Sequence, residues 1–297
     1  IADEAHNLAG HPRPDFRVVL GDELPTAARV FMTATQVTTT PAPAQPGWDD
    51  WLAPLSMNDE SKFGPVVYRL DFAEAIERQL LSDYEVLIYE TPGESAPDPV
   101  AALLAAAGTG LSRVLTFHGR VAKARAFADA VNGVRLPDGR RIRAVAVAGA
   151  DPAIYRSRAL ALLEDPDPAT LVVVASARCL AEGVDVPAVD GILFADPKSS
   201  DVGIIQSVGR ALRLAPGKST GKVLIPVCYS ADLDEDTTLS NSSFAAVWRI
   251  LRGLRTLDAR LSAELDSYTR PQSRQGREDG SRAVPRVTFD LPSTRDL

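Results

Sequence analysis

The chain has 297 residues, of which 45% are hydrophobic and 24% charged, values that exclude a disordered or collagen-like chain. The formal charge of −7 at pH 7 excludes a uniformly basic nucleic-acid coat. Only two cysteines and three histidines occur, which argues against a disulfide framework or zinc cluster and favours a reducing, cytoplasmic setting. No apolar run approaches the roughly 18 residues of a membrane span, so no membrane partner is expected.

The first part of the chain carries short apolar runs separated by irregular segments. Strands are expected at residues 1–4, 28–35 and 86–89. A helix is expected over 71–82, because Asp71 can cap its first turn and Phe72, Ile76 and Leu80 recur at helical spacing. The Pro- and Gly-rich segment 91–99 predicts a domain boundary, so that residues 1–97 form one domain portion with its linker.

From residue 98 apolar runs alternate with amphipathic segments, which is typical of βαβ units and a parallel sheet. Strands are expected at 114–117, 143–147, 171–175, 191–195 and 223–227. Helices are expected at 99–107, 121–131, 152–164, 178–182 and 201–213. The sequence therefore predicts an α/β domain over residues 98–235.

The last part of the chain, residues 236–297, begins with a long amphipathic stretch. Leucines and Trp248 form one stripe over 243–267, which predicts a helix. From residue 268 Arg, Ser, Gly and Pro dominate, and a loosely ordered tail is expected.

A pair of carboxylates follows the first expected strand, in the run Asp3-Glu4-Ala5-His6. Open parallel sheets bind ligands at the carboxyl ends of their strands. In nucleotide hydrolases an aspartate at this place holds Mg²⁺, and an adjacent glutamate orients the attacking water. A solvated turn after a strand explains the same four residues equally well.

The helix expected at 201–213 carries Gln206, Gly209, Arg210 and Arg213. The two arginines are three residues apart, which predicts that both lie on one side of the helix. A planar, permanently charged guanidinium suits a phosphoryl group that gathers negative charge in its transition state. The alternative is a cationic helix face that is merely solvated.

A third motif joins Ser176, at the end of an expected strand, to Gly183 and Asp185. A serine there can bond a phosphodiester, and the two later residues can approach a nucleotide. Taken alone, these residues are explained better as a strand, a turn and a glycine-bearing helix end.

In their order and spacing these motifs resemble the motor core of superfamily 2 helicases and translocases. The resemblance places motif II at 3–6, motif III at 33–35, motif IV at 114–120, motif V at 176–185 and motif VI at 206–213. Residues 56–65, 72–84, 177–187 and 247–261 are similar to the restriction-enzyme type of bacterial DEAD/DEAH-box helicases. This type includes type III restriction motors and helicases with helicase-associated repeats. Leu212 stands between the arginines where RNA-directed members usually have Gly, which favours DNA.

The resemblance implies ATP and Mg²⁺ as cofactors and DNA as a partner. It implies catalytic roles for Asp3, which would also hold Mg²⁺, and for Glu4, Arg210 and Arg213. The residues implied to bind the nucleotide are His6, Gly183, Asp185, Gln206 and Gly209. The residues implied to bind nucleic acid are Thr33, Thr35, His118, Arg120, Ser176 and Arg178.

Two observations from the residues themselves bear on the DNA interface. Residues 111–125 hold four basic residues and no acidic residue, a patch that could meet phosphates, with simple solubility as the alternative explanation. His118 fits polar packing at a strand end better than a catalytic base.

The phosphate-binding loop Gly-x-x-x-x-Gly-Lys-Ser/Thr, which this family needs, is not found ahead of motif II. Residues 217–220, Gly-Lys-Ser-Thr, lack its first glycine because position 212 is leucine, and we interpret them as a basic turn. Since the chain starts at Ile1 inside an expected strand, the loop is expected upstream of it. The chain then comprises the C-terminal part of a first RecA-like domain (1–97), a complete second one (98–235), and a C-terminal helix with tail (236–297).

The sequence therefore predicts an α/β fold of RecA-like parallel sheets with flanking helices, in a fragment of an ATP-dependent DNA helicase or translocase. The complete protein would be an ATP hydrolase, and the fragment alone is expected to be inactive. Further expected partners are the upstream half of the first domain and a fused or associated nuclease, methyltransferase or helicase-associated repeat. Two alternatives stay open: a non-catalytic RecA-like module that binds DNA or protein, and a structural protein with an oligomerisation helix at 248–268.

Overall fold

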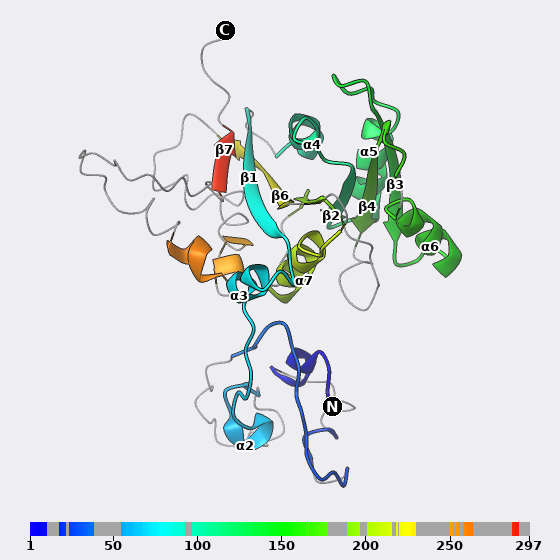
Figure 1. Cartoon of the computed structure of the whole chain (residues 1–297). Coiled ribbons are helices and arrows are strands. Elements are labelled where there is room, and N and C mark those ends of the chain that lie inside the picture. The colour runs from blue at the N-terminus through cyan, green and yellow to red at the C-terminus, as the bar shows by residue number, and fades with distance from the viewer. Residues whose placement is uncertain are drawn as a thin grey trace, which may run out of the picture. The chain divides into compact units, whose positions relative to one another are not determined.

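A computed structural model describes residues 1–10, 18–21, 24–38, 55–92, 97–164, 166–177, 189–196, 201–215, 218, 220–229, 250–251, 253–255, 258–263 and 287–290. They belong to two compact units, Ile1–Leu70 (unit 1) and Asp71–Leu297 (unit 2), and each unit is described by itself. Figure 1 labels the helices and strands of both units.

Unit 2 is built on a seven-stranded sheet in which every neighbouring pair is parallel. The strands are β1 (Asp83–Pro92), β2 (Arg113–His118), β3 (Arg141–Ala148), β4 (Thr170–Ala177), β5 (Gly191–Phe194), β6 (Thr220–Tyr229) and β7 (Val287–Asp290). Their order across the sheet is β3-β4-β2-β5-β6-β1-β7. The α/β class and the parallel sheet that the sequence predicts are confirmed.

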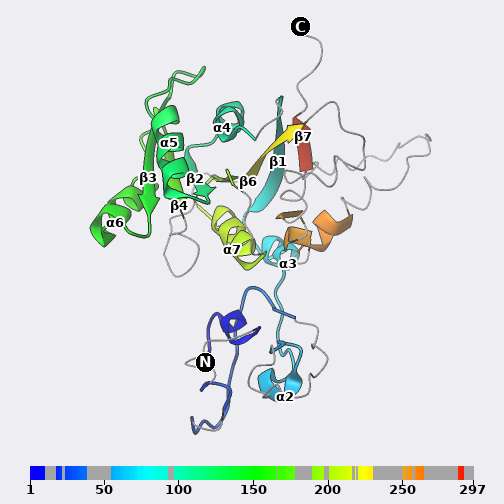
Figure 2. The same cartoon turned by 180° about the vertical axis from the view of Figure 1, so that it is seen from behind.

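Helices cover both faces of this sheet, as the two opposite views show (Figures 1 and 2). They are α3 (Phe72–Glu77), α4 (Pro99–Ala107), α5 (Val121–Val131), α6 (Ala153–Ala161) and α7 (Asp201–Ala211). The apolar side chains form two buried clusters: α4 and α5 contribute to one, and α3, α6 and α7 contribute to the other. Strands β2, β4 and β5 are buried along nearly their whole length, because helices cover the sheet on either side.

Aspartate caps begin two of these helices as their residue types predict. The Asp98 carboxylate accepts hydrogen bonds from the amides of Val100 and Ala101, and the Asp71 carboxylate accepts one from the Glu74 amide at 2.8 Å. Helix α3 nevertheless ends at Glu77, well before the expected residue 82, because Gln79 adopts a left-handed φ of 56°. Leu80 is therefore 55% exposed and does not extend the buried stripe.

The division between the two units lies between Leu70 and Asp71, whereas the sequence indicated a boundary at 97–98. The difference arises because β1, which precedes the Pro- and Gly-rich segment, pairs along its whole length with β6. Ten consecutive residue pairs tie this strand to unit 2, and sequence composition carries no information about that pairing.

The C-terminal region contributes to the core of unit 2. Among its described residues, Ile250, Leu251, Leu254 and Leu261 are buried in the same cluster as α7, so this stripe packs within the chain. Residues 287–290 correct the expectation of a loose tail, because they form β7 and pair with β1.

Unit 1 contains the short 3₁₀ helix η1 (Ala5–Leu8) and the helix α2 (Glu60–Phe63). The two expected strands meet only in a parallel bridge between Ala2 and Phe31. Val30 and Met32 are 47% and 50% exposed, not buried as expected, since no strand of unit 1 continues the ladder in the described residues. Among the helices described in either unit, none is both long and apolar enough to cross a membrane.

Candidate active site

Two neighbouring acidic residues of unit 1, Asp3 and Glu4, lie just before η1. The Glu4 amide donates a hydrogen bond to Asp3 Oδ1 at 2.9 Å, and Glu4 adopts a left-handed φ of 49°. A non-glycine residue in this conformation is uncommon and is found at functional turns. Asp3 is exposed and the Glu4 side chain is 44% exposed, so both carboxylates are accessible within unit 1.

A series of polar contacts connects Glu4 to the threonines at 33 and 35. His6 is buried, and its Nδ1 lies 3.3 Å from Glu4 Oε2 and 3.2 Å from Thr33 Oγ1. The Thr33 hydroxyl donates to the carbonyl of Thr35 at 2.9 Å, and the Ala5 amide donates to the Met32 carbonyl at 2.8 Å. The structure thus brings together the segments that the sequence indicated as motifs II and III.

Thr33 and Thr35 were expected to contact nucleic acid, but Thr33 is partly buried and Thr35 is buried within unit 1. Thr35 is only 7% exposed, and its hydroxyl oxygen has no hydrogen-bond partner among the described residues. Thr33 is engaged by His6.

In unit 2 the two arginines of motif VI do not share one helix face. Helix α7 ends at Ala211, so Arg213 lies in the turn beyond it, where its amide donates to the Arg210 carbonyl at 3.3 Å. Arg210 is 8% exposed, whereas Arg213 is exposed. The early end of the helix separates a buried guanidinium from an exposed one.

Gln206 and Gly209, on the same helix, are both partly exposed. A Cβ atom added at Gly209 would meet no described atom within 4 Å. Packing within unit 2 therefore does not require glycine at this position.

Lys218, which belongs to the Gly-Lys-Ser-Thr run, points toward the end of α7. Its Nζ donates to the carbonyls of Ala211 and Arg213, the latter at 2.9 Å. Burial lowers the pKa of Lys218 to about 8, with Asp190 opposing this shift. The contact agrees with the interpretation of this run as a basic turn.

His118 ends β2 and is buried, with 6% of its surface exposed. Its Nε2 lies 2.8 Å from Thr116 Oγ1, and its ring centroid lies 4.9 Å from that of Phe127. Burial lowers the pKa of His118 to about 4, and the nearby Asp196 opposes this shift. The histidine is neutral at pH 7 and packs in the interior, as its place at a strand end indicated.

The buried histidine predicts a loss of stability in acid. Its folded pKa of about 4 lies below the ordinary 6.5, so the unfolded chain binds more protons between these values and stability falls as pH drops through them. We expect this group to lower the free energy of unfolding by about 2 kcal/mol between pH 7 and pH 5. Urea unfolding at both pH values measures the effect, and His118→Gln should reduce the difference. An equal difference in the variant would contradict the assignment.

The basic patch at 111–125 is largely neutralised by acids from distant segments. Arg113 pairs with Asp190 at 2.9 Å, Lys123 pairs with Asp196, and Arg125 lies 3.5 Å from Asp151. Arg120 is exposed at the N-terminus of α5 and forms no ion pair within the described part of the chain.

Of the remaining sequence-predicted site residues, one is buried and the others lie outside the described residues. Ser176 is the last residue but one of β4 and is 1% exposed. Arg178, Gly183 and Asp185 lie outside the described residues, so their expected roles stay predictions.

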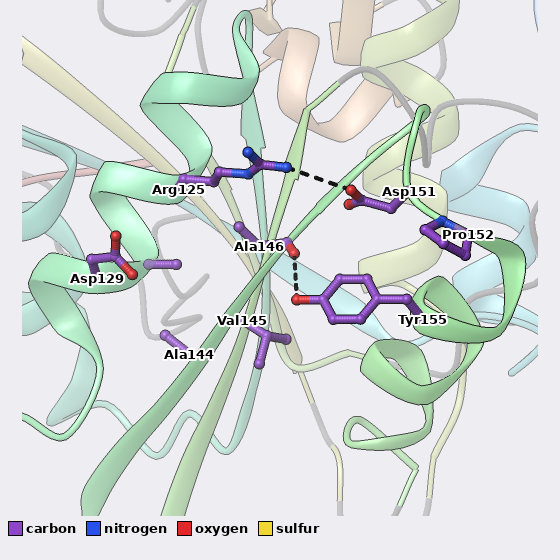
Figure 3. A pocket seen from close by; sticks show the side chains of 9 residues that line it. Arg125, Asp129, Ala144, Val145, Ala146, Asp151, Pro152 and Tyr155 are labelled. Carbon is purple, nitrogen blue, oxygen red and sulfur yellow. Dashed lines mark hydrogen bonds and ion pairs between the residues drawn. The ribbon is translucent and has the colours of Figure 1, made fainter.

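A separate pocket of about 540 Å³ lies at the edge strand β3, between α5 and α6 (Figure 3). Tyr155 donates from its hydroxyl to the Ala146 carbonyl at 3.2 Å, and the ion pair of Arg125 with Asp151 spans the pocket (Figure 3). None of the sequence-predicted site residues lines it. Among the described residues, no group of three His, Cys, Asp or Glu side chains could hold a metal ion.

Comparison with known proteins relates the chain to helicases. No family model matches it. It is 25% identical over 244 residues to a probable helicase of African swine fever virus, strain Badajoz 1971 Vero-adapted, and equally so to that of the Pretoriuskop tick isolate. These matches cover 76% of the chain but 26% of the viral proteins, so the chain spans about a quarter of their length.

One solved structure has a similar fold over nearly the whole chain. It is an ATP-dependent type ISP restriction-modification enzyme, LlaBIII, bound to DNA, with a TM-score of 0.72 and 22% identity. The match covers 97% of this chain and 21% of the enzyme. The chain therefore has the RecA-like fold that the sequence predicted, and the matched enzyme is itself a restriction-modification enzyme.

Proposed function

We propose that the chain is part of an ATP-dependent DNA helicase or translocase of the restriction-enzyme type. The RecA-like fold and the helicase relatives support the general class, an ATP-driven nucleic-acid motor. The observation that carries the finer proposal is that His6 Nδ1 lies within 3.3 Å of Glu4 Oε2 and within 3.2 Å of Thr33 Oγ1. It connects a carboxylate suited to hydrolysis with a segment that the resemblance assigns to nucleic-acid coupling.

The acidic residues fit a role toward Mg²⁺ and ATP. Mg²⁺ keeps several waters and needs only one or two protein carboxylates, so the exposed Asp3 would be one of its protein ligands, together with a residue of the phosphate-binding loop. Glu4, beside it, would orient the attacking water. Bound ATP supplies the phosphoryl group, and the carboxylates act on its metal and its water.

The arginines would stabilise the charge of the transferring phosphoryl group. Arg210 is held in the interior of unit 2, while the Arg213 guanidinium is exposed and able to reach a ligand. Gly209 would let the nucleotide approach the helix backbone, which agrees with the open space around its Cα. Gln206 would contact the nucleotide from the same helix.

DNA is the nucleic acid along which we propose that the complete protein moves. The type ISP enzyme with this fold was solved bound to DNA. In this chain, the exposed Arg120 is the basic residue of its patch that is left available for a phosphate. A fused or associated nuclease, methyltransferase or helicase-associated repeat, and a cytoplasmic location, remain predictions from the sequence.

The proposal predicts a difference between the isolated chain and the full-length gene product. Residues 1–297 should bind ATP weakly or not at all in calorimetry, because the phosphate-binding loop Gly-x-x-x-x-Gly-Lys-Ser/Thr does not occur among them. The full-length product should hydrolyse ATP faster when DNA is added. Micromolar ATP binding by residues 1–297 would show that these residues hold ATP without that loop and would contradict this part of the proposal. An absence of DNA-stimulated hydrolysis in the full-length product would favour the non-catalytic binding module.

A further inference from the structure

The end of helix α7 is held by two side chains from outside the helix, those of Ser82 and Lys218. The carbonyl of Leu212 accepts hydrogen bonds from the Ser82 amide at 2.8 Å and the Ser82 hydroxyl at 3.1 Å. The carbonyls on either side of it, those of Ala211 and Arg213, both accept from Lys218 Nζ. Three consecutive carbonyls at the end of the helix are thus bound from outside it.

The last carbonyls of a helix have no partner within the helix and carry partial negative charge. An ammonium group there satisfies them and is attracted to the helix terminus. Lys218 lies seven residues beyond Ala211 and five beyond Arg213, so the chain must turn back to place it. The side chain of Lys218 therefore contacts the end of the helix that precedes it in the sequence.

The backbone at the end of α7 is closely packed. Ala211 and Leu212 are fully buried. A Cβ atom at Gly221 would lie 2.3 Å from the Ala211 carbonyl oxygen, so the start of β6 is pressed against the same carbonyl. Arg213, by contrast, is exposed, so its backbone is fixed while its side chain reaches solvent.

We propose that Lys218 is a positioning residue for Arg213, which it holds by bonding the carbonyls of Ala211 and Arg213. This inference rests on the proposed role of Arg213 at the phosphoryl group. In this proposal the lysine acts only through the backbone that carries the guanidinium. A misplacement of about 1 Å at a reacting centre can cost ~10²-fold in rate, so a fixed backbone matters for such a role.

The first experiment measures the turn itself in residues 1–297. In Lys218→Met, amide hydrogen exchange at Arg213 and Leu214 should be about tenfold faster or more, because the turn opens more often. Lys222→Met is the matched control, since Lys222 likewise donates from Nζ to a backbone carbonyl, but to that of Thr109, which does not belong to this turn. Unchanged exchange at both amides in Lys218→Met, or equal acceleration in the control, would overturn the proposal.

The second experiment measures DNA-stimulated ATP hydrolysis by the full-length gene product. Lys218→Met should lower kcat by ~10-fold or more and leave the KM for ATP and the DNA affinity unchanged. Lys218→Arg, which keeps the charge and the donors, should restore most of kcat. Lys218→Met should have no further effect in an Arg213→Ala background, because its influence passes through Arg213.

The outcomes separate this inference from the proposed function. Normal turnover in Arg213→Ala would remove the proposed role of that arginine. An inactive Arg213→Ala together with normal kcat in Lys218→Met would overturn only the positioning role. A kcat loss that Lys222→Met shares, or that adds to the loss in Arg213→Ala, would show a general effect on the fold and would also overturn it.

Discussion

In the full-length gene product, Arg213→Ala is expected to lower DNA-stimulated ATP hydrolysis by ~10³-fold or more. An arginine that neutralises the transferring phosphoryl group contributes ~10³ to 10⁵ in rate in comparable systems. Arg213 is exposed, and its backbone is held by Lys218, so its removal should take away charge without opening the core. Steady-state ATPase assays with saturating DNA measure the effect.

DNA affinity and thermal stability should change little in this variant, because the side chain lies outside the buried clusters. Arg158→Ala removes an exposed arginine from α6 and provides a matched loss of charge. It should hydrolyse ATP at the rate of the unaltered protein. Near-normal turnover in Arg213→Ala would end the assignment of this residue to catalysis.

Gly221→Ala is expected to destabilise residues 1–297 by several kcal/mol, roughly the cost of a severe steric clash in a packed core. Its Cβ would lie 2.3 Å from the Ala211 carbonyl oxygen and 3.0 Å from the carbonyl carbon, so β6 and α7 would have to separate. The start of β6 pairs with β1, which restricts that movement. Urea unfolding followed by circular dichroism measures the loss.

Gly209→Ala gives the matched control for this prediction. A Cβ there meets no described atom within 4 Å, and alanine is favoured over glycine inside a helix by ~1 kcal/mol. The folded chain should therefore be as stable as the unaltered one or slightly more so. If Gly221→Ala were as stable as Gly209→Ala, the close approach of β6 to α7 would be contradicted.

Most of unit 2 follows from local properties of the sequence. Buried parallel strands need continuous apolar runs, and these runs predicted β2, β4 and β6 to within a few residues. The helix expected at 99–107 has the bounds of α4, where the Asp98 carboxylate caps the first turn and Pro99 fits it. Helix α5 has the bounds expected from its periodicity, Val121 to Val131.

The errors occur where a neighbour distant in the sequence decides the outcome. β1 joins unit 2, and β7 orders part of the tail, because each finds an open strand edge beside it. The basic patch at 111–125 loses most of its charge to Asp151, Asp190 and Asp196, which come from other segments. Neither the periodicity nor the composition of a segment indicates which distant residues will pair with it.

The candidate site shows the same division between sequence and structure. The residue types at 3–6 and 206–213 were determined by the sequence alone, because carboxylates suit a metal and water, and guanidinium groups suit a phosphoryl charge, wherever they lie. Only the tertiary structure decided that His6 connects Glu4 to Thr33, that Arg210 is buried while Arg213 is exposed, and that Ser82 and Lys218 bind the end of α7. These contacts depend on where the chain turns and what packs beside it, and both are properties of the whole fold.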